Sequence, residues 1–149
     1  MSLSTFTLAQ VVMDLEPGYK MLRQLPHWHG PSHTLVGAAA LAGVTVAVAL
    51  PVVWLFDRLG GRRGLRFHLP LRAALCGALL GTFSHVALDA VMHADVFPFW
   101  PLGRANPLRG LLSVPALYDL CFWSAAVGGV AWGVLAAARR RRAARPALA

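Results

Sequence analysis

The sequence predicts an all-α protein: a polytopic bundle of about three transmembrane helices, preceded by a short apolar or re-entrant N-terminal segment. Hydrophobic residues make up 57% of the 149-residue chain and charged residues only 13%, and the mean hydropathy is +0.57. A helix needs about 20 mostly apolar residues to cross the hydrocarbon of a bilayer. Runs of that length occur at residues 34–56, 71–93 and 113–138. We expect residues 1–149 to form a single membrane domain surrounded by lipid.

The segment before the first span has no charge until Asp14 and is too short to cross a bilayer as a helix. A half-helix, a re-entrant piece and the remnant of a longer segment all remain open for residues 1–13, which lack the basic start of a secretory signal. Asp14-Leu-Glu-Pro17 predicts a short acidic turn. Residues 26–33 contain three histidines broken by Gly and Pro, which predicts a loop with Ser32 as the N-cap of the first span.

Small residues indicate where the spans pack. Gly77 and Gly81 are four residues apart in the second span, a spacing that lets another backbone approach closely, and Gly129 and Gly133 repeat it in the third. Residues 94–112, rich in Pro and aromatic residues, predict a loop. The two cysteines lie inside apolar segments without a CxxC spacing, so we expect two inert buried thiols.

The basic residues are segregated, which predicts the orientation in the membrane. The positive-inside rule assigns the arginine-rich side to the cytoplasm, together with a basic tail at residues 139–149. Most histidines and acidic residues fall at the opposite end. Although the net charge is +8, the arginines cluster at span ends, so we expect no nucleic-acid partner. Ten of the fourteen basic residues lie on the cytoplasmic side: Arg58, Arg62, Arg63, Arg66, Arg72, Arg139, Arg140, Arg141, Arg142 and Arg145.

A polar stripe near the end of the second span is the strongest functional signal. His85, Asp89 and His93 recur every four residues, so a helix places them on one face. Burying an ionisable group in an apolar helix costs roughly several kcal/mol of free energy unless a partner group or a metal ion compensates for the lost hydration. The stripe therefore predicts half of a metal site at the non-cytoplasmic end of this helix.

Other residues at the same level complete the predicted site. His33 begins the first span and reaches the same outer level, so it is a predicted ligand, and Asp14 precedes it in an acidic turn that can fold over the site. The carboxylates Asp14, Glu16 and Asp119 are the candidate catalytic groups, as a general base or as partners of a bound imidazole. Mixed His and carboxylate ligands favour zinc, with manganese or iron as alternatives, and the number of candidates allows one or two ions.

Simpler interpretations stay open. The stripe is also compatible with a hydrogen-bonded polar seam between helices. His27 and His29 fit solvated loop residues, Glu16 fits a capping role, and Asp95 fits a turn. His29, Arg104 and Arg109 are candidate substrate contacts, since arginine binds phosphate bidentately, although both arginines also fit ordinary interfacial positions.

Two motifs resemble a known family. His-Gly-Pro-Ser-His-Thr at 29–34 and Gly-Thr-Phe-Ser-His-Val-Ala-Leu-Asp at 81–89 resemble the HRGxTHS and GxxSHxxxD signature of the YdjM-like bacterial inner-membrane proteins, described as LexA-regulated metal-dependent hydrolases. Residues 92–101 and 106–108 look like a subgroup of these proteins, so that the match covers roughly residues 10–110. The resemblance implies metal ligation at His33, His85 and Asp89, adds Asp14 and His93, and implies a location in the bacterial inner membrane.

These observations lead to two functional hypotheses. The first is a membrane-embedded metal-dependent hydrolase with its site at the non-cytoplasmic interface, acting on a lipid or phosphoester substrate. The second is a non-enzymatic membrane subunit or scaffold whose helices are held by a metal or a His/Asp network. A homo-oligomer or a membrane partner is compatible with either. A permease is disfavoured because residues 73–81 offer no polar groups that would continue a path to the cytoplasm.

Overall fold

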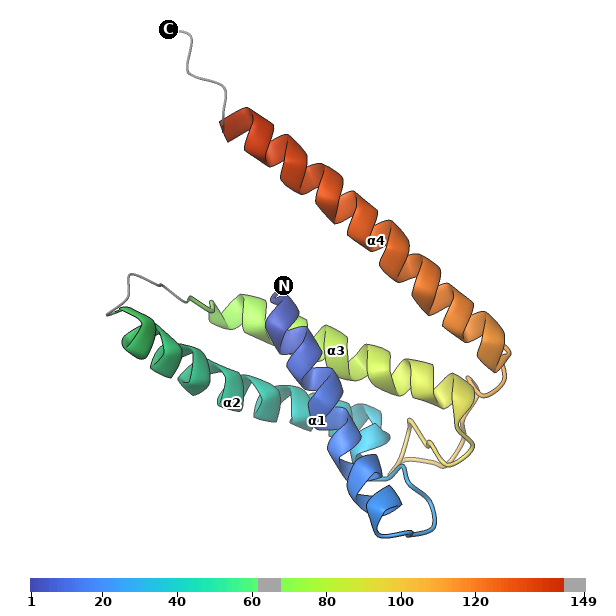
Figure 1. Ribbon diagram of the computed structural model, residues 1–149. Coiled ribbons are helices and arrows are strands. Elements are labelled where there is room, and N and C mark those ends of the chain that lie inside the picture. Colours follow the sequence, from blue (N-terminus) through green and yellow to red (C-terminus); the bar gives the residue numbers. More distant parts are fainter. Residues whose placement is uncertain (62–67, 144–149) are drawn as a thin grey trace, which may run out of the picture. The chain divides into compact units, whose positions relative to one another are not determined.

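The computed structural model describes residues 1–61 and 68–143, and within them every regular element is helical (Figure 1). A single turn of 3₁₀ helix, Pro31–His33, precedes the second long helix. Three helices are long and apolar enough to span a membrane. The predicted polytopic all-α fold with three spans is therefore confirmed. The long helices are α1 (Leu3–Leu22), α2 (Leu35–Gly61), α3 (Leu71–Met92) and α4 (Val114–Ala143).

The chain divides into two compact units, one from Met1 to Leu111 and one that begins at Leu112. The first contains α1 to α3, and the second contains α4. Large apolar side chains such as Phe122, Trp123 and Trp132 are exposed around α4. A helix that is apolar all round suits contact with lipid. The prediction of a single membrane domain stays a prediction.

The acidic turn predicted at Asp14-Leu-Glu-Pro17 is wrong, because these residues lie inside α1. Ser2 caps this helix by accepting a hydrogen bond from the Thr5 backbone N–H at 3.4 Å. Pro17 removes one intrahelical hydrogen bond, but the helix is held along its length by tertiary packing, with Ala9 and Met13 fully buried. Packing therefore outweighs the local preference for a turn.

The glycines of α3 form the surface on which α1 lies. A Cβ atom at Gly77 would lie 2.3 Å from the Ser2 carbonyl oxygen, and one at Gly81 would lie 2.9 Å from the Phe6 carbonyl oxygen. The Ser2 backbone N–H also donates to the Ala73 carbonyl oxygen at 2.9 Å. The predicted close approach at these glycines is confirmed, and the approaching backbone is that of α1. In contrast, nothing lies within 4 Å of a Cβ atom built on Gly129 or Gly133.

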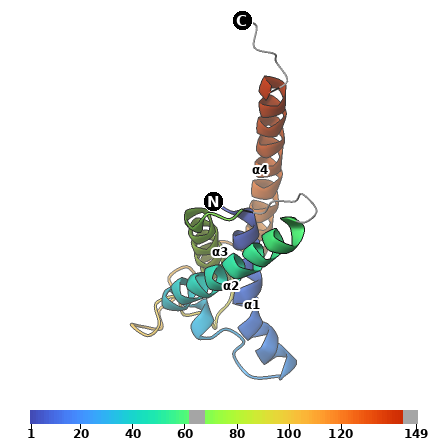
Figure 2. The same cartoon turned by 90° about the vertical axis from the view of Figure 1, so that its left-hand side faces the viewer.

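These contacts set the direction of α1. Its start lies beside the start of α3, and both helices run the same way, so residues 10–16 reach the level of His85 and Asp89. α2 runs antiparallel to α3, with Ala42 and Val46 packed among small side chains of α3. Figure 2 shows α1, α2 and α3 from the side, and α1 contacts both other helices. The start of α2 and the end of α3 therefore meet beside the second half of α1.

The loop from residue 93 to residue 113, as predicted, lacks regular structure and covers this end. The Pro98 carbonyl oxygen accepts a hydrogen bond from the Leu35 backbone N–H at 2.8 Å. The Asn106 side chain donates to the Ala90 and Val96 carbonyl oxygens at 2.9 and 3.1 Å. The loop thereby satisfies backbone groups that the ends of α2 and α3 would otherwise leave open.

Several predicted boundaries are corrected. Thr34 rather than Ser32 is the N-cap of α2, because its Oγ1 accepts the Gly37 backbone N–H at 2.9 Å. α2 continues to Gly61, and α4 continues through arginines predicted in the tail. Cys76 and Cys121 are exposed rather than buried. Arg62, Arg63, Arg66 and Arg145 lie outside the described residues.

The α1–α3 contact yields the first prediction. Gly81→Ala places a methyl group against the Phe6 backbone and Ala9, so we expect it to lower the free energy of unfolding in detergent by about 1–3 kcal/mol, the usual cost of overpacking. Gly43→Ala is the matched control, because nothing lies within 4 Å of a Cβ atom there. Titration with SDS followed by circular dichroism measures both. Equal stability of the two variants would contradict the close packing.

Candidate metal centre

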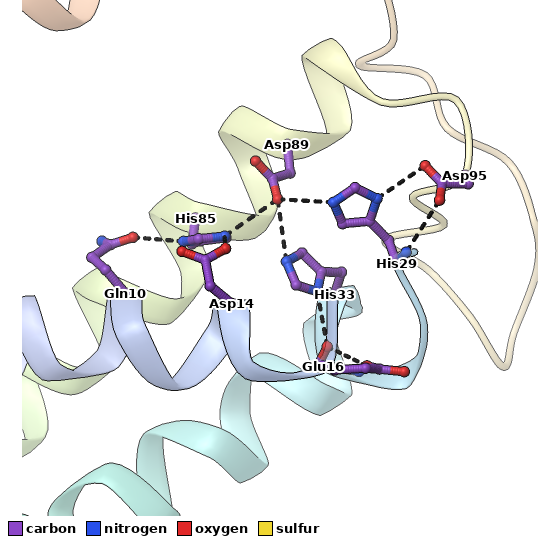
Figure 3. Close-up of polar contacts among 9 residues, drawn as sticks. Gln10, Asp14, Glu16, His29, His33, His85, Asp89 and Asp95 are labelled. Atoms are coloured by element: carbon purple, nitrogen blue, oxygen red, sulfur yellow. Dashed lines mark hydrogen bonds and ion pairs between the residues drawn. The ribbon is translucent and has the colours of Figure 1, made fainter. Parts of the chain in front are cut away.

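Four histidines and two aspartates converge at the covered end of the first unit. Figure 3 shows five of them, from separate parts of the chain: Asp14 from α1, His29 and His33 from the segment that leads into α2, and His85 and Asp89 from α3. The sixth, His93, is the C-cap of α3. Two groups have ligand atoms within 4.8 Å of one another. The first group is Asp14, His33 and His85, and the second is His29, Asp89 and His93.

The carboxylate of Asp89 lies between the two groups. Its Oδ2 atom is 3.2 Å from Nε2 of His33, 3.3 Å from Nε2 of His85 and 3.6 Å from Nε2 of His29. The Oδ1 atom of Asp14 lies 3.3 Å from the same His85 nitrogen. Three imidazoles therefore surround Oδ2 of Asp89, and the carboxylate of Asp14 lies on the side next to α1.

These distances fit a bound cation. Ligand atoms held at about 2.0–2.1 Å from a tetrahedral zinc ion lie about 3.3–3.4 Å from one another. The spacings of 3.2 and 3.3 Å around Nε2 of His33 and His85 match that value. Histidine nitrogen with carboxylate oxygen is a donor set that zinc, manganese and iron accept.

The two central ring nitrogens face carboxylates but make no hydrogen bond. Nε2 of His33 and Nε2 of His85 are buried and make no hydrogen bond, although both are within ion-pair distance of Asp89. The His33 side chain has no exposed surface at all. A buried polar atom without a partner costs about 1–3 kcal/mol, and proteins rarely leave one in place. Unpaired nitrogens that face a carboxylate without hydrogen-bond geometry fit a cation better than a hydrogen-bonded seam.

A chain of hydrogen bonds sets the proton position on His33. Ser32 Oγ donates to Oε2 of Glu16, and Oγ lies 2.8 Å from Nδ1 of His33. The single hydroxyl proton of Ser32 is committed to the carboxylate, so Nδ1 must be the donor in the second bond. A neutral His33 therefore carries its proton on Nδ1 and presents a bare Nε2 to the centre.

His85 is fixed in the same way by Gln10. The side-chain amide nitrogen of Gln10 donates to the Gly81 carbonyl oxygen at 3.2 Å. Its oxygen therefore faces Nδ1 of His85, at 2.7 Å, and can only accept. A neutral His85 therefore carries its proton on Nδ1 and presents a bare Nε2.

Asp95 anchors the third imidazole. Its two carboxylate oxygens accept from the backbone N–H of His29 at 3.1 Å and from Nδ1 of His29 at 2.9 Å. Nε2 of His29 then faces Asp89. In proteins, an outer hydrogen bond of this kind orients nearly every metal-bound histidine. Three of the four histidines have one here, which supports the assignment as a metal centre.

The charges of the outer residues follow from these contacts. Burial raises the pKa of the Glu16 carboxyl group, but hydrogen bonds from Lys20 and Ser32 lower it by more, so this pKa lies below its ordinary value. Burial likewise raises the pKa of Asp95, and the hydrogen bonds from His29 reverse the effect. Burial lowers the pKa of His29, which the Asp95 carboxylate only partly offsets. Near neutral pH, both carboxylates are ionised and His29 is neutral, as a metal ligand must be.

A cavity of about 340 Å³ opens beside the second group. His29 belongs both to its wall and to the cluster, and Asp95, which anchors His29, also lines the wall. Arg104 is the arginine in this wall. A small polar or amphipathic molecule can therefore reach the cluster from this side. The lining residues are His27, His29, Gly30, Pro31, Thr34, Asp95, Phe97, Trp100 and Arg104.

The predicted site residues divide as follows. Asp14, His33, His85, Asp89 and His93 all lie in the cluster, and their ligation stays a prediction. His93 is the C-cap of α3 in an extended conformation, beside His29 at a ring-centroid distance of 4.4 Å, rather than a further turn of the stripe.

The remaining predicted residues are less uniform. The interpretation of His29 as a solvated loop residue is wrong, because its side chain is 7% exposed. Both carboxylate oxygens of Glu16 are engaged by Lys20 and Ser32, which suits a positioning role. Arg109 is exposed and does not line the cavity described. Asp119 lies on α4 in the other unit, so its catalytic role stays a prediction.

Sequence reasoning missed three supporting residues: Gln10, Ser32 as a relay, and Asp95 as an anchor. Gln10 precedes Asp14 by four residues, which places both on one helix face. The expected turn at Asp14 concealed that spacing. Ser32 precedes His33 directly in the sequence. A hydroxyl group this close to a candidate histidine ligand could have indicated a hydrogen bond to the ring nitrogen that does not face the site.

Comparisons with family models, curated proteins and solved structures give no match for this chain. The chemistry of the site is therefore derived from its own residues.

The outer hydrogen bonds yield the second prediction. Ser32→Ala and Gln10→Leu remove the groups that orient His33 and His85, and we expect each to weaken Zn²⁺ binding about 10- to 100-fold. Competition with a fluorescent chelator measures the affinity. Ser124→Ala, at an exposed position of α4, is the control and should bind as the wild type does. Unchanged affinity in both site variants would contradict an orienting role.

The third prediction concerns the protonation of His29. In metal-free protein we expect the His29 ring to titrate below pH 6.5, and Asp95→Asn to move the midpoint lower still, because burial then acts without the opposing carboxylate. The folded state disfavours the proton, so this group reduces stability as pH falls below 6.5 and has no effect above it. NMR titration of the imidazole protons checks this, and a midpoint above 6.5 would contradict it.

Proposed function

We propose that this protein is a membrane-embedded, metal-dependent hydrolase of the bacterial inner membrane, with its site at the non-cytoplasmic interface and a phosphoester amphiphile as substrate. One observation carries the proposal: the bare, buried Nε2 atoms of His33 and His85 face Asp89 beside a cavity that holds an arginine. Zinc is the favoured ion. The resemblance of residues 29–34 and 81–89 to the YdjM-like signature supports the same assignment.

The depth of the site supports an interfacial substrate. The cluster lies where α2 begins and α3 ends, and both helices are candidate membrane spans. Arg58 and Arg72 lie at the opposite ends of these helices. Under the positive-inside rule the site then faces the non-cytoplasmic side. Phe97 and Trp100 in the cavity wall suit the apolar part of a lipid-like molecule.

The charge of the cavity favours phosphate. Arg104 presents a guanidinium group that can donate two parallel hydrogen bonds to phosphate oxygens. Its planar fork makes this binding specific as well as strong. The cluster beyond His29 would add positive charge once a cation is bound. A phosphate group would then bind between Arg104 and the cluster, with its ester bond next to the candidate metal ligands.

Hydrolysis requires few groups from the chain. The histidines and aspartates of the cluster would hold a divalent ion, which would supply Lewis acidity and a bound water with a pKa near neutrality. Asp14 can accept a proton at its outer carboxylate oxygen, because its side chain is 65% exposed while its Oδ1 faces His85. The water oxygen bonds to phosphorus, the ester P–O bond breaks, and one water proton passes through solvent to Asp14, which lies on the His85 side of the cluster, away from the cavity. The alkoxide that leaves takes a proton from solvent, and Arg104 holds the phosphate product.

A scaffold is the second candidate, and one observation favours it. Asp14, His33, His85 and Asp89 provide four donors, a number that closes a tetrahedral site. A closed site would fasten α1 to α2 and α3 without catalysis. Such a protein would bind metal tightly and hydrolyse nothing. A second copy of the chain or another membrane protein would then be its partner.

The fourth prediction is an activity test. We expect Zn²⁺-loaded protein in phospholipid vesicles to release phosphate or a phosphorylated headgroup from a panel of lipid and soluble phosphoesters. The double variant His85→Ala, Asp89→Ala should lose both the metal and the activity. Arg104→Ala should lower kcat/KM about 10- to 100-fold by removing a charged hydrogen-bond pair. Arg109→Ala is the matched control and should leave it unchanged.

The outcomes separate the two candidates. Metal binding that depends on His85 and Asp89, without turnover of any phosphoester, would favour the scaffold. Turnover that survives loss of these residues would overturn the assignment of the site.

A further inference from the structure

The cluster holds more ligands than one ion can use. We propose that it binds two divalent cations at once, with Asp89 as a carboxylate that bridges them. The inference rests on the proposed function only in taking the cluster as a metal site. Six side chains contribute, three in each group, whereas a tetrahedral ion accepts four donors. A single ion would leave two side chains of the cluster without a role.

The four imidazole rings contact one another in succession, from His85 through His33 and His29 to His93. Adjacent ring centroids are 5.2 Å apart for His85 and His33, 4.7 Å for His33 and His29, and 4.4 Å for His29 and His93. Asp89 lies beside this series, with Oδ2 within 3.6 Å of three ring nitrogens. Four imidazoles in succession, with one carboxylate beside three of them, suit two ions side by side.

Asp89 is the residue able to serve both groups. A carboxylate has two oxygens and about four lone pairs, so it can bind an ion with each oxygen. One oxygen already lies at ligand spacing from His33 and His85. Asp89 is also grouped with His29 and His93 at distances that suit a shared ion. Pairs of ions in hydrolytic sites lie about 3.5–4 Å apart, a separation that one bridging carboxylate can span.

The two positions differ in how completely the protein fills them. The first ion would have Asp14, His33, His85 and Asp89, which makes four donors. The second would have His29, His93 and Asp89, which makes three. Three protein ligands leave a tetrahedral position open. His29 also lines the cavity, so the open position belongs to the ion on the substrate side.

The surrounding charges are sufficient for two ions. Asp14 and Asp89 provide two negative charges within the cluster. Asp95 adds a third through the hydrogen bond to His29, and Glu16 adds a fourth through Ser32 and His33. Lys20 offsets part of the charge of Glu16. Two divalent ions would balance these four carboxylates, so the positive charge of Lys20 would be left over and would favour a bound phosphate.

Metal stoichiometry tests the inference. Full-length protein in detergent is equilibrated with Zn²⁺, desalted, and analysed for zinc per chain by mass spectrometry. We expect two ions per chain in the wild type, one in His93→Ala and one in His85→Ala. His27→Ala is the matched control, because His27 belongs to neither group, and it should keep two. One ion in the wild type, or two in His93→Ala, would overturn the proposal.

Loading with Mn²⁺ tests the bridge without any variant. Two ions joined by Asp89 should give the multi-line electron paramagnetic resonance spectrum of a coupled pair. The six-line spectrum of isolated ions would overturn the shared ligand. Neither readout depends on turnover, so the proposed hydrolase can fail while the two-ion site stands. Conversely, an active enzyme with one ion per chain would retain the function and refute this inference.

Discussion

The packing of α1 on the glycine face of α3 is the contact on which the site depends. α1 is not among the candidate membrane spans, and its charged residues begin at Asp14. It is positioned by backbone contact at Gly77 and Gly81, where a side chain would not fit. That contact brings Gln10 and Asp14 to His85. Without it, the second and third helices would present histidines with neither an orienting amide nor a second carboxylate.

The hydrogen bonds around the cluster explain why three of its histidines turn Nε2, rather than Nδ1, toward the centre of the cluster. Each of the three anchored imidazoles donates Nδ1–H to an oxygen that can only accept or has already committed its proton. Groups that can only accept a hydrogen bond therefore fix these donors. They are the Gly81 carbonyl oxygen that binds the Gln10 amide, the Glu16 carboxylate that binds Ser32, and the Asp95 carboxylate that binds His29. These hydrogen bonds orient the three rings with Nε2 toward the centre of the cluster, as outer hydrogen bonds do for metal-bound histidines.

Hydropathy and small-residue spacing predicted the three spans and the close approach at Gly77 and Gly81, because both signals are local in sequence. The stripe of His85 and Asp89 was visible for the same reason. The course of α1 was not, because Pro17 and two nearby acidic residues favour a turn locally and only contact with α3 overrides them. His93 was assigned to the helix, but α3 ends at Met92 and turns this residue toward His29. Such contacts join distant segments, which spacing alone does not reveal.

A metal ion bound by the cluster would contribute to the stability of the first unit. The contacts between α2 and α3 involve mainly small side chains such as Ala42, Ala74 and Ala78, which bury little apolar area each. Within a bilayer, apolar burial between helices gains little over contact with lipid. An ion that binds only the folded arrangement stabilises it by RT ln(1 + [L]/Kd), about 2.7 kcal/mol at a concentration 100 times Kd. Because its ligands come from α1, from the segment before α2 and from α3, this stabilisation acts on the arrangement of all three. Metal binding at this cluster would therefore be coupled to the docking of α1, because Asp14 reaches the other candidate ligands only when α1 lies on α3.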